Sequence, residues 1–163
     1  MADLWFYELP LLGRCGVEVE NGAVRRLLLG LEAVGENMGA NTSLQAETAK
    51  QLTEYVQGER HCFDIPCRPS GTAFQLSVWR ALRRIPWGEQ RTYGQIAEYL
   101  GVSGGARAVG NAVGANPIPI IIPCHRVLAA GGRLGGFRLG REMKEELLNL
   151  EHTRIIGRKI EKI

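Results

Sequence analysis

The chain has 163 residues, of which 45% are hydrophobic, a share typical of globular domains with a real core. No run of about 18 uncharged apolar residues is present, which argues against a membrane-spanning helix. The first residues lack the basic flank and the apolar stretch of a secretory signal. We therefore expect a cytoplasmic protein of one ordinary domain or two small ones.

Charge is distributed unevenly along the chain, although the net charge is only +3. Residues 1–68 carry 6 Lys and Arg against 10 Asp and Glu, whereas residues 69–163 carry 14 against 7. A basic half beside an acidic half is typical of a module that binds a polyanion such as nucleic acid. A well-solvated basic surface explains the same charge balance equally well.

The first third of the chain predicts antiparallel β structure followed by one helix. Residues 5–7 are aromatic and suit a short strand. Asn21-Gly22 between two apolar arms predicts a hairpin, because both turn positions need positive φ. A helix is expected to end at Gly58, with one face made of Leu44, Thr48, Leu52, Tyr55 and Val56. Residues 63–66 are expected to be extended, since the position before a proline disfavours helix.

A domain boundary is expected at residues 69–72, where proline, serine and glycine follow one another and the charge balance changes sign. We therefore expect an N-terminal α/β domain over residues 1–68. A C-terminal domain would cover residues 73–157, and a basic tail would follow over residues 158–163.

The second domain opens with a pattern of helices. Thr72 suits the cap of a helix that Pro86 stops, and the apolar face of this helix is Phe74, Val78, Leu82 and Ile85. Thr92-x-x-Gln95 has the form of a capping box, which starts a helix that ends at Gly101. A final helix over 141–151 would present to a core the side chains of Met143, Leu147 and Leu150.

Residues 101–105 join two short helices, the second over 106–115, in the proportions of a DNA-binding helix-turn-helix. This second helix has little side-chain bulk, because Ala106, Ala108 and Gly110 surround a single Arg107. Small residues let a backbone approach the narrow minor groove, with the arginine as a wedge or probe. Close helix–helix packing also favours Gly and Ala, so the pattern alone leaves both interpretations open.

Cys124 follows a run of isoleucines bracketed by three prolines, residues 117–123. This run predicts a stiff, buried, extended segment that holds the thiol at a fixed point. Burial raises the pKa of a thiol, so reaction requires a base or a positive neighbour, and His125 is the candidate. Glu151, at the end of the last helix, is the candidate to orient that histidine. The alternative is a core cysteine next to a surface histidine.

The other three cysteines, Cys15, Cys62 and Cys67, are expected to be free thiols buried among apolar side chains. His61-Cys62 followed by Cys67 could be half of a metal site, but no second pair stands at a zinc-like spacing. We therefore expect neither a metal nor another cofactor.

Residues 121–127, Ile-Ile-Pro-Cys-His-Arg-Val, resemble the signature of the O6-alkylguanine-DNA alkyltransferases. The resemblance covers residues 63–157, and the matching segments are 63–66, 71–75, 78–79, 88–89, 93–97, 106–110, 116–117 and Glu151. Residues 1–62 resemble the family in architecture only, a small antiparallel sheet plus helix of ribonuclease-H-like shape. The implied fold class is mixed α/β (α+β), with a mostly helical C-terminal domain of winged-helix or helix-turn-helix type.

The resemblance implies a role for each residue around the thiol. Cys124 would be the alkyl acceptor, His125 its general base through a bridging water, and Glu151 the partner that orients the histidine. Asn116 would stabilise the turn around the site. Tyr93 would rotate the 3′ phosphate and donate a hydrogen bond to N3 of the flipped guanine.

Toward DNA, Arg107 corresponds to a finger that fills the space left by the flipped base. The other implied DNA contacts are Tyr93, Ala106, Ala108, Gly110 and Arg126. The implied guanine pocket includes Val127, Phe137 and Arg138. Carbonyls of Cys124 and Val127 would accept from the exocyclic amine, and the Arg138 backbone N–H would face O6. Phe137 and Arg138 depart from some relatives, and an arginine here would narrow the pocket or reach a phosphate.

The implied function is repair of double-stranded DNA by irreversible transfer of the alkyl group from O6-alkylguanine, and from O4-alkylthymine, to Cys124. Base flipping by a minor-groove-bound helix-turn-helix is implied with it, in a monomer associated with the nucleoid. One alternative is a lesion sensor without chemistry, which would replace the reactive cysteine. The other is a cysteine hydrolase, which would need turnover and an oxyanion hole.

Overall fold

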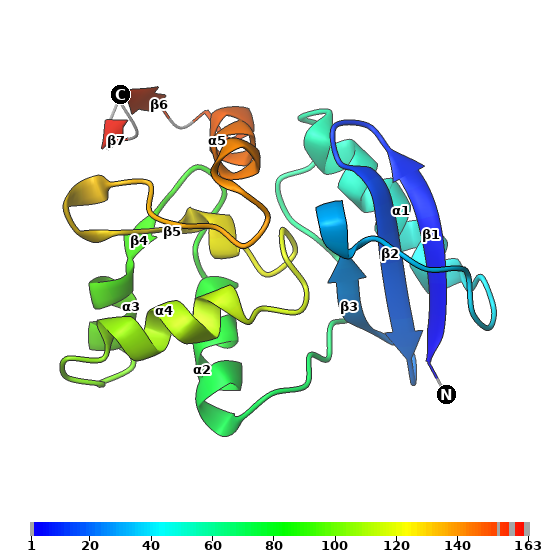
Figure 1. Ribbon diagram of the computed structural model, residues 1–163, viewed down its shortest axis with the longest axis horizontal. Helices are drawn as coiled ribbons and strands as arrows, with labels where there is room; N and C mark the ends of the chain where they lie inside the picture. The colour runs from blue at the N-terminus through cyan, green and yellow to red at the C-terminus, as the bar shows by residue number, and fades with distance from the viewer. Residues whose placement is uncertain (1, 153, 157–158, 162–163) are drawn as a thin grey trace. The chain divides into compact units, whose positions relative to one another are not determined.

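The structure is a computed structural model that describes residues 2–152, 154–156 and 159–161. It consists of two compact units, Met1–Ser70 and Gly71–Ile163, which we call the N-terminal and the C-terminal unit (Figure 1). The architecture is mixed α/β, as expected. No helix in the described part of the chain is long and apolar enough to cross a membrane.

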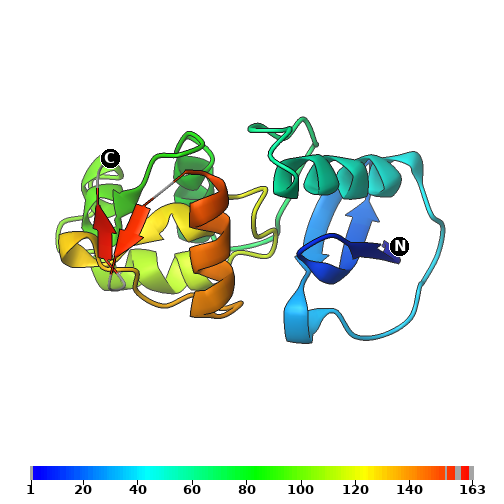
Figure 2. The same ribbon diagram turned by 90° about the horizontal axis from the view of Figure 1, so that it is seen from above.

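The N-terminal unit is a three-stranded antiparallel sheet with one helix on one of its faces (Figure 2). The strands, in the order β1-β2-β3, are β1 (Asp3–Leu9), β2 (Gly13–Glu20) and β3 (Ala23–Leu28). A 3-10 turn, η1 (Gly30–Glu32), leads to the helix α1 (Ser43–Val56). The predicted hairpin between β2 and β3 is confirmed, since Asn21 and Gly22 have φ values of +52° and +74°.

The helix α1 is fastened at its start and packed along one face. Thr42, the residue before the helix, forms a capping box with Gln45. Gln45 Nε2 donates to the carbonyls of Asp3 (2.9 Å) and Val17 (3.2 Å), which belong to β1 and β2. On the packed face of the helix, Leu52 is fully buried. These contacts tie the helix to two strands of the sheet.

The C-terminal unit is mostly helical. Its helices are α2 (Ala73–Leu82), α3 (Tyr93–Tyr99), α4 (Ala106–Gly114) and α5 (Arg141–Leu150), with 3-10 turns η2 (Cys124–Arg126) and η3 (Ala130–Gly132). Two short parallel strands, β4 (Arg91–Thr92) and β5 (Val127–Leu128), pair beside η2. Near the C-terminus β6 (Arg154–Ile156) pairs antiparallel with β7 (Lys159–Glu161), and β7 lies within the stretch 158–163 expected to be a basic tail.

Local capping signals place the helices of this unit as predicted. Thr72 forms a capping box with Gln75 at the start of α2, and Thr92 forms one with Gln95 at the start of α3. The helices α3 and α4 are joined by a short turn and pack against each other, in a helix-turn-helix arrangement. The indole Nε1 of Trp79 donates to the carbonyl of Ala112 (2.8 Å), so α2 is also fixed to α4.

Three packing predictions were wrong. Cys62 is exposed and Cys67 half-buried, so of the three structural thiols only Cys15 lies in the core. On α5 the predicted burial of Leu147 is confirmed, but Met143 and Leu150 are only half-buried, and Lys144 and Leu148 are buried in their place. A lysine at a core position breaks the apolar pattern from which the face was predicted.

The segment before Cys124 is buried as predicted, but it is a compact turn and not extended. The N–H of Ile122 donates to the carbonyl of Ile118 (2.9 Å), which folds the chain back on itself. Ile120 is almost completely buried and has φ of +73°. A β-branched residue is rarely found in this left-handed region, so the surrounding packing must hold the turn in place.

Candidate active site

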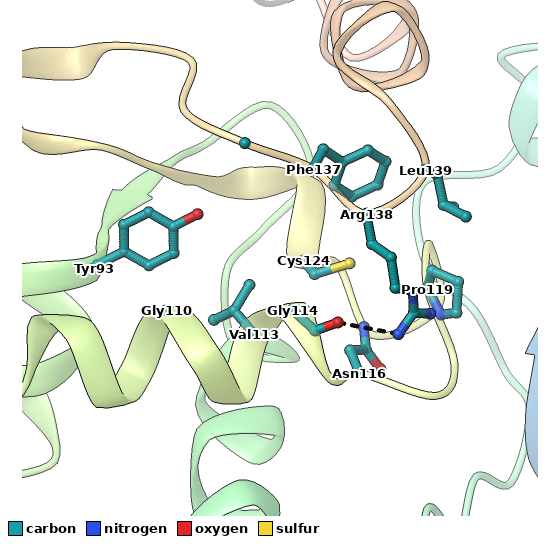
Figure 3. A pocket seen from close by; sticks show the side chains of 11 residues that line it. Tyr93, Gly110, Val113, Gly114, Asn116, Pro119, Cys124, Phe137, Arg138 and Leu139 are labelled. Atoms are coloured by element: carbon teal, nitrogen blue, oxygen red, sulfur yellow. Dashed lines mark hydrogen bonds between the residues drawn. The ribbon is translucent and has the colours of Figure 1, made fainter.

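Cys124 lies at the start of η2 and its thiol faces a cavity of about 280 Å³ (Figure 3). The residues that line this cavity are Tyr93, Gly110, Val113, Gly114, Asn116, Pro119, Cys124, Gly136, Phe137, Arg138 and Leu139. They come from the start of α3, the second half of α4, the turn after it and the loop before α5. The cavity therefore lies next to the helix-turn-helix.

Asn116 braces the turn that leads to the thiol. Its Nδ2 donates to the carbonyl of Ile122 (2.8 Å), and its Oδ1 accepts from the N–H of Ile118 (2.9 Å). The side chain is nearly completely buried, so both bonds form away from water, where leaving either group unpaired would be costly. Asn116 thus lies where the resemblance implied, with contacts that stabilise the turn.

The environment of the Cys124 thiol has opposing effects on its ionisation. Burial raises the pKa of Cys124 above its ordinary value, because the thiolate is poorly solvated there. A hydrogen bond with Asn116 and the positive charges of Arg138 and Lys144 act in the other direction. Cys124 is therefore a thiol at rest, and these neighbours stabilise the thiolate once it forms.

A buried chain of charged groups stands behind the thiol. His125 Nε2 lies 2.7 Å from Glu151 Oε2, and both side chains are fully buried. Arg126 donates to the same carboxylate through Nε (2.8 Å) and Nη2 (2.9 Å), and the N–H of Gly88 reaches Glu151 Oε1 at 3.3 Å. The predicted contact between His125 and Glu151 is therefore present.

These contacts determine the protonation states of the pair. Burial alone would raise the pKa of Glu151, but the bonds from His125 and Arg126 outweigh it and lower the pKa to about 2. Burial lowers the pKa of His125 below its ordinary value, against the opposing effect of Glu151. At neutral pH the arrangement is a carboxylate beside a neutral imidazole, which is the form that accepts a proton.

The expected DNA contact of Arg126 is contradicted by its placement. Its side chain is almost completely buried, with both Nε and Nη2 on Glu151 and Nη1 donating to the carbonyl of Ile85 (2.6 Å). A guanidinium used in this way faces the interior and does not reach a phosphate. The residue instead holds Glu151 in position. Sequence reasoning missed this because the partners lie 25 and 41 residues away.

Lys144 is a further site residue that the sequence reasoning missed. It is fully buried on α5, and its Nζ donates to the carbonyls of Val127 (2.7 Å) and Gly136 (3.3 Å). Burial lowers its pKa to about 8, an effect that the nearby Cys124 partly opposes. Lys144 therefore ties the strand after the thiol to the cavity loop. Its spacing to Leu147 and Leu148 was the signal that could have revealed it.

The implied guanine pocket is only partly reproduced. Phe137 and Arg138 line the cavity, whereas Val127 is fully buried and does not. The Val127 carbonyl, expected to face the base, accepts the hydrogen bond from Lys144. Val127 therefore contributes to the support of the loop, and the expected hydrogen bond from the base to its carbonyl stays a prediction.

The side chains implied to contact DNA lie mainly on α4. Ala106, Arg107 and Ala108 are exposed at its start, and Gly110 reaches the cavity. Tyr93, the first residue of α3, lies on the same side, since a Cβ added at Gly110 would stand 3.8 Å from its ring. Burial raises the pKa of Tyr93, so its hydroxyl keeps its proton at neutral pH. The phenol of Tyr93, the start of α4 with its small side chains, and the thiol of Cys124 therefore lie in one region of the C-terminal unit.

No group of three or more His, Cys, Asp or Glu side chains in the described ranges could hold a metal ion. The exposed Cys62 and the half-buried Cys67 thus do not complete a metal site with other described residues. The polar side chains that line the cavity are the thiol of Cys124, the phenol of Tyr93, the carboxamide of Asn116 and the guanidinium of Arg138.

Comparisons with known proteins agree with this geometry. Residues 73–153 match the family model of the DNA binding domain of 6-O-methylguanine DNA methyltransferase. A methylated-DNA–protein-cysteine methyltransferase of Methanosarcina acetivorans is 50% identical over 111 residues, which are 68% of this chain and 71% of that protein. The chain belongs to the methylated-DNA–protein-cysteine methyltransferase family. An enzyme of the same name from Mycobacterium tuberculosis is 52% identical over 104 residues, 64% of this chain and 63% of that protein.

Solved structures extend the family likeness over both units. The O6-methylguanine methyltransferase of Mycobacterium tuberculosis has a TM-score of 0.83 at 36% identity, covering 96% of each chain. A structure of that organism's OGT in complex with DNA has a TM-score of 0.76 at 38% identity, covering 90% of each chain. The N-terminal unit of this methyltransferase-family chain thus shares the family's architecture, as expected from its sheet and helix.

Proposed function

We propose that this protein repairs DNA by transferring an alkyl group from O6 of guanine, and from O4 of thymine, irreversibly to the sulfur of Cys124. Repair by alkyl transfer is the activity of its family. The observation that carries the specific assignment is the buried thiol at a cavity, backed by the His125–Glu151–Arg126 chain. Such a chain suits a cysteine that must lose its proton in a dry site.

The transfer step starts from the neutral imidazole. His125 takes the thiol proton through a bridging water, and Glu151 stabilises the resulting imidazolium, which it already faces at 2.7 Å. The Cys124 thiolate attacks the alkyl carbon, so an S–C bond forms and the C–O6 bond breaks. Its electron pair stays on the guanine, which takes a proton from the hydroxyl of Tyr93. Tyr93 is reprotonated from solvent and the His125 imidazolium releases its proton to solvent, so the net change moves the thiol proton to the guanine. The thioether product is stable, so each chain acts once.

The damaged base must leave the duplex before this step. An alkyl group on O6 lies inside the base stack, whereas Cys124 is buried in a cavity. The exposed Ala106 and Ala108 permit close approach to a minor groove, and Arg107 between them can fill the space left by the base. Unstacking costs a few kcal/mol, which an inserted side chain partly offsets.

Intact-mass measurement tests the assignment to Cys124. After incubation with a duplex that contains O6-methylguanine, the protein should gain the mass of one methylene group and no more. Cys124→Ala should bind the duplex but keep its mass, whereas Cys15→Ala, which alters a buried thiol outside the site, should be methylated normally. An unchanged mass of the wild-type protein would favour a lesion sensor, and repeated turnover would favour a hydrolase.

A second experiment tests base extrusion by Arg107. Arg107→Ala should slow transfer from duplex DNA by about tenfold, which corresponds to a loss of about 1.4 kcal/mol of transition-state stabilisation. The free base O6-benzylguanine needs no extrusion, so its reaction with the variant should match the wild-type rate. Equal losses with both substrates would contradict the assigned role. Arg80→Ala, an exposed arginine on α2, is the matched control.

A further inference from the structure

A turn before β4 holds the Glu151 carboxylate in addition to its two side-chain partners. The N–H of Gly88 donates to Glu151 Oε1 (3.3 Å). The turn is closed by the N–H of Glu89, which donates to the carbonyl of Pro86 (3.1 Å). Gly88, the third residue of this turn, has φ of +81°, which favours glycine there. A Cβ added at Gly88 would stand 3.4 Å from the backbone oxygen of Glu151, so the turn packs directly on the end of α5.

The side chain of Trp87, in the same turn, contacts the residue that follows Glu151. The ring centroids of Trp87 and His152 lie 5.1 Å apart at an interplanar angle of 80°, which is an edge-to-face contact. Aromatic rings in this geometry attract one another beyond the effect of the apolar area that they bury. The turn therefore contacts Glu151 through its backbone and the following residue through its indole.

The backbone conformation of His152 is unusual for a residue with a side chain. His152 has φ of +61°, and its N–H donates to the carbonyl of Asn149 (3.0 Å), directly after the end of α5. Glycine is the usual residue at such a helix end, because it adopts the left-handed region without strain. The ring of His152 is exposed, so burial in the core does not explain the histidine. The gain that the structure shows for this side chain is its contact with Trp87.

We propose that Trp87 and His152 form a positioning pair for alkyl transfer. Their contact fixes the end of α5 against the turn, so that Glu151 faces His125. Because Glu151 directly precedes His152, a shift of the helix end would move its carboxylate away from the imidazole that it contacts at 2.7 Å. Neither ring is among the side chains that line the cavity of Cys124. The inference rests on the proposed function, in which Glu151 stabilises the imidazolium, and adds a support for that step.

His152→Gly is the deciding variant, because it removes the ring and at the same time suits the left-handed backbone. Its Tm should stay close to that of the wild type, since relief of strain offsets the lost ring contact. Its single-turnover rate constant with a duplex that contains O6-methylguanine should fall about tenfold, a part of the roughly 100- to 10,000-fold that a positioned general base contributes. Trp87→Ala should show a similar fall, whereas Trp87→Phe keeps a ring for the histidine and should retain most of the rate.

Two further comparisons separate positioning from other roles. The rate with the free base O6-benzylguanine should fall by the same factor and the Kd for the duplex should be unchanged, because the pair affects the reaction and not DNA binding. In a Glu151→Gln background, His152→Gly should slow transfer no further, since the carboxylate that the ring positions is already gone. His61→Gly, at an exposed histidine of the N-terminal unit, is the matched control and should react at the wild-type rate.

The contrary outcomes have separate meanings. An unchanged rate in His152→Gly or in Trp87→Ala, with methyl transfer by the wild type intact, would overturn the inference and leave the proposed function standing. Further slowing in the Glu151→Gln background would show that the pair acts elsewhere and would also overturn it. A rate loss in His152→Gly that comes with a lowered Tm would make the pair structural, with the same consequence. Absence of methyl transfer in the wild type would instead refute the proposed function.

Discussion

The two units bury polar side chains of different kinds. In the N-terminal unit the buried polar residues are neutral: Gln45, Thr48 and Gln51. In the C-terminal unit they are Asn116, His125, Arg126, Lys144 and Glu151, of which all but the asparagine are ionisable. Burying an ionisable group costs much more than burying an amide, so the second set requires compensating contacts that the first does not.

The neutral buried side chains of the N-terminal unit hold its helix, strands and following segment together. Gln45 joins α1 to two strands, and Gln51 Oε1 accepts from the N–H of Asp64 (2.9 Å), which fixes the segment after the helix. The ion pairs described in this unit, such as Arg60 with Glu54, are at least partly exposed. Such pairs contribute little to stability. The N-terminal unit therefore gains specificity from amide hydrogen bonds and keeps its charges near water.

Cys15 and Cys124, one buried thiol in each unit, show the same contrast between apolar and charged surroundings. Burial in the apolar core raises the pKa of Cys15 to about 12. Burial also raises the pKa of Cys124, but there Asn116, Arg138 and Lys144 favour the thiolate. A buried cysteine is thus inert in an apolar core and reactive where charged groups surround it.

The largest effect is expected from removing Arg126. Arg126→Met leaves the buried Glu151 without two of its hydrogen bonds, and breaking a buried pair in this way costs about 3–5 kcal/mol. The free energy of unfolding, measured in urea, should fall by that amount. Alkyl transfer should slow strongly as well, because the carboxylate that orients His125 is displaced.

Gln45→Ala is the counterpart in the N-terminal unit. Loss of its bonds to Asp3 and Val17 leaves buried carbonyls unsatisfied, at a cost of about 1–3 kcal/mol. Transfer by the folded variant should proceed at the wild-type rate. If Gln45→Ala slowed transfer as much as Arg126→Met, the neutral buried residues would matter for the reaction as well, and the contrast between the two units would be wrong.

A smaller effect is expected from acid. The pKa of Glu151 is about 2 in the folded protein, against an ordinary value of 4.5. The unfolded chain therefore binds a proton first, so this contribution is fully present above pH 4.5 and is lost as the pH falls toward 2. Tm measured across this range should decline less steeply in Glu151→Gln than in the wild type. Glu54→Gln, at a partly exposed pair, should follow the wild-type slope.

Features encoded by near neighbours were predictable from the sequence. The Asn21-Gly22 hairpin and the caps at Thr72 and Thr92 depend on residues within three positions of each other. The position of Cys124 beside His125 was read directly from the chain. Glu151, 26 residues from His125, was a candidate partner because it ends the last helix, and the resemblance implied the same role; the structure contains the contact.

Features that depend on distant partners were not predictable in this way. The burial of Arg126 follows from carbonyl and carboxylate groups far along the chain, so an arginine beside a reactive residue resembled a phosphate ligand. Lys144 is buried because two backbone carbonyls meet its ammonium group. The turn at Ile120 adopts a backbone conformation that its residue type disfavours, and only the assembled core can impose it.

The turn at Ile120 makes alkyl transfer depend on how tightly the surrounding core is packed. A left-handed isoleucine stores about 1–3 kcal/mol of conformational energy, and Ile120 lies only four positions before the reactive sulfur. Any loosening of the interior lets the backbone relax toward a common conformation and carries the nucleophile away from its imidazole partner. Gentle heating should consequently abolish alkyl uptake at a lower temperature than it melts the helices.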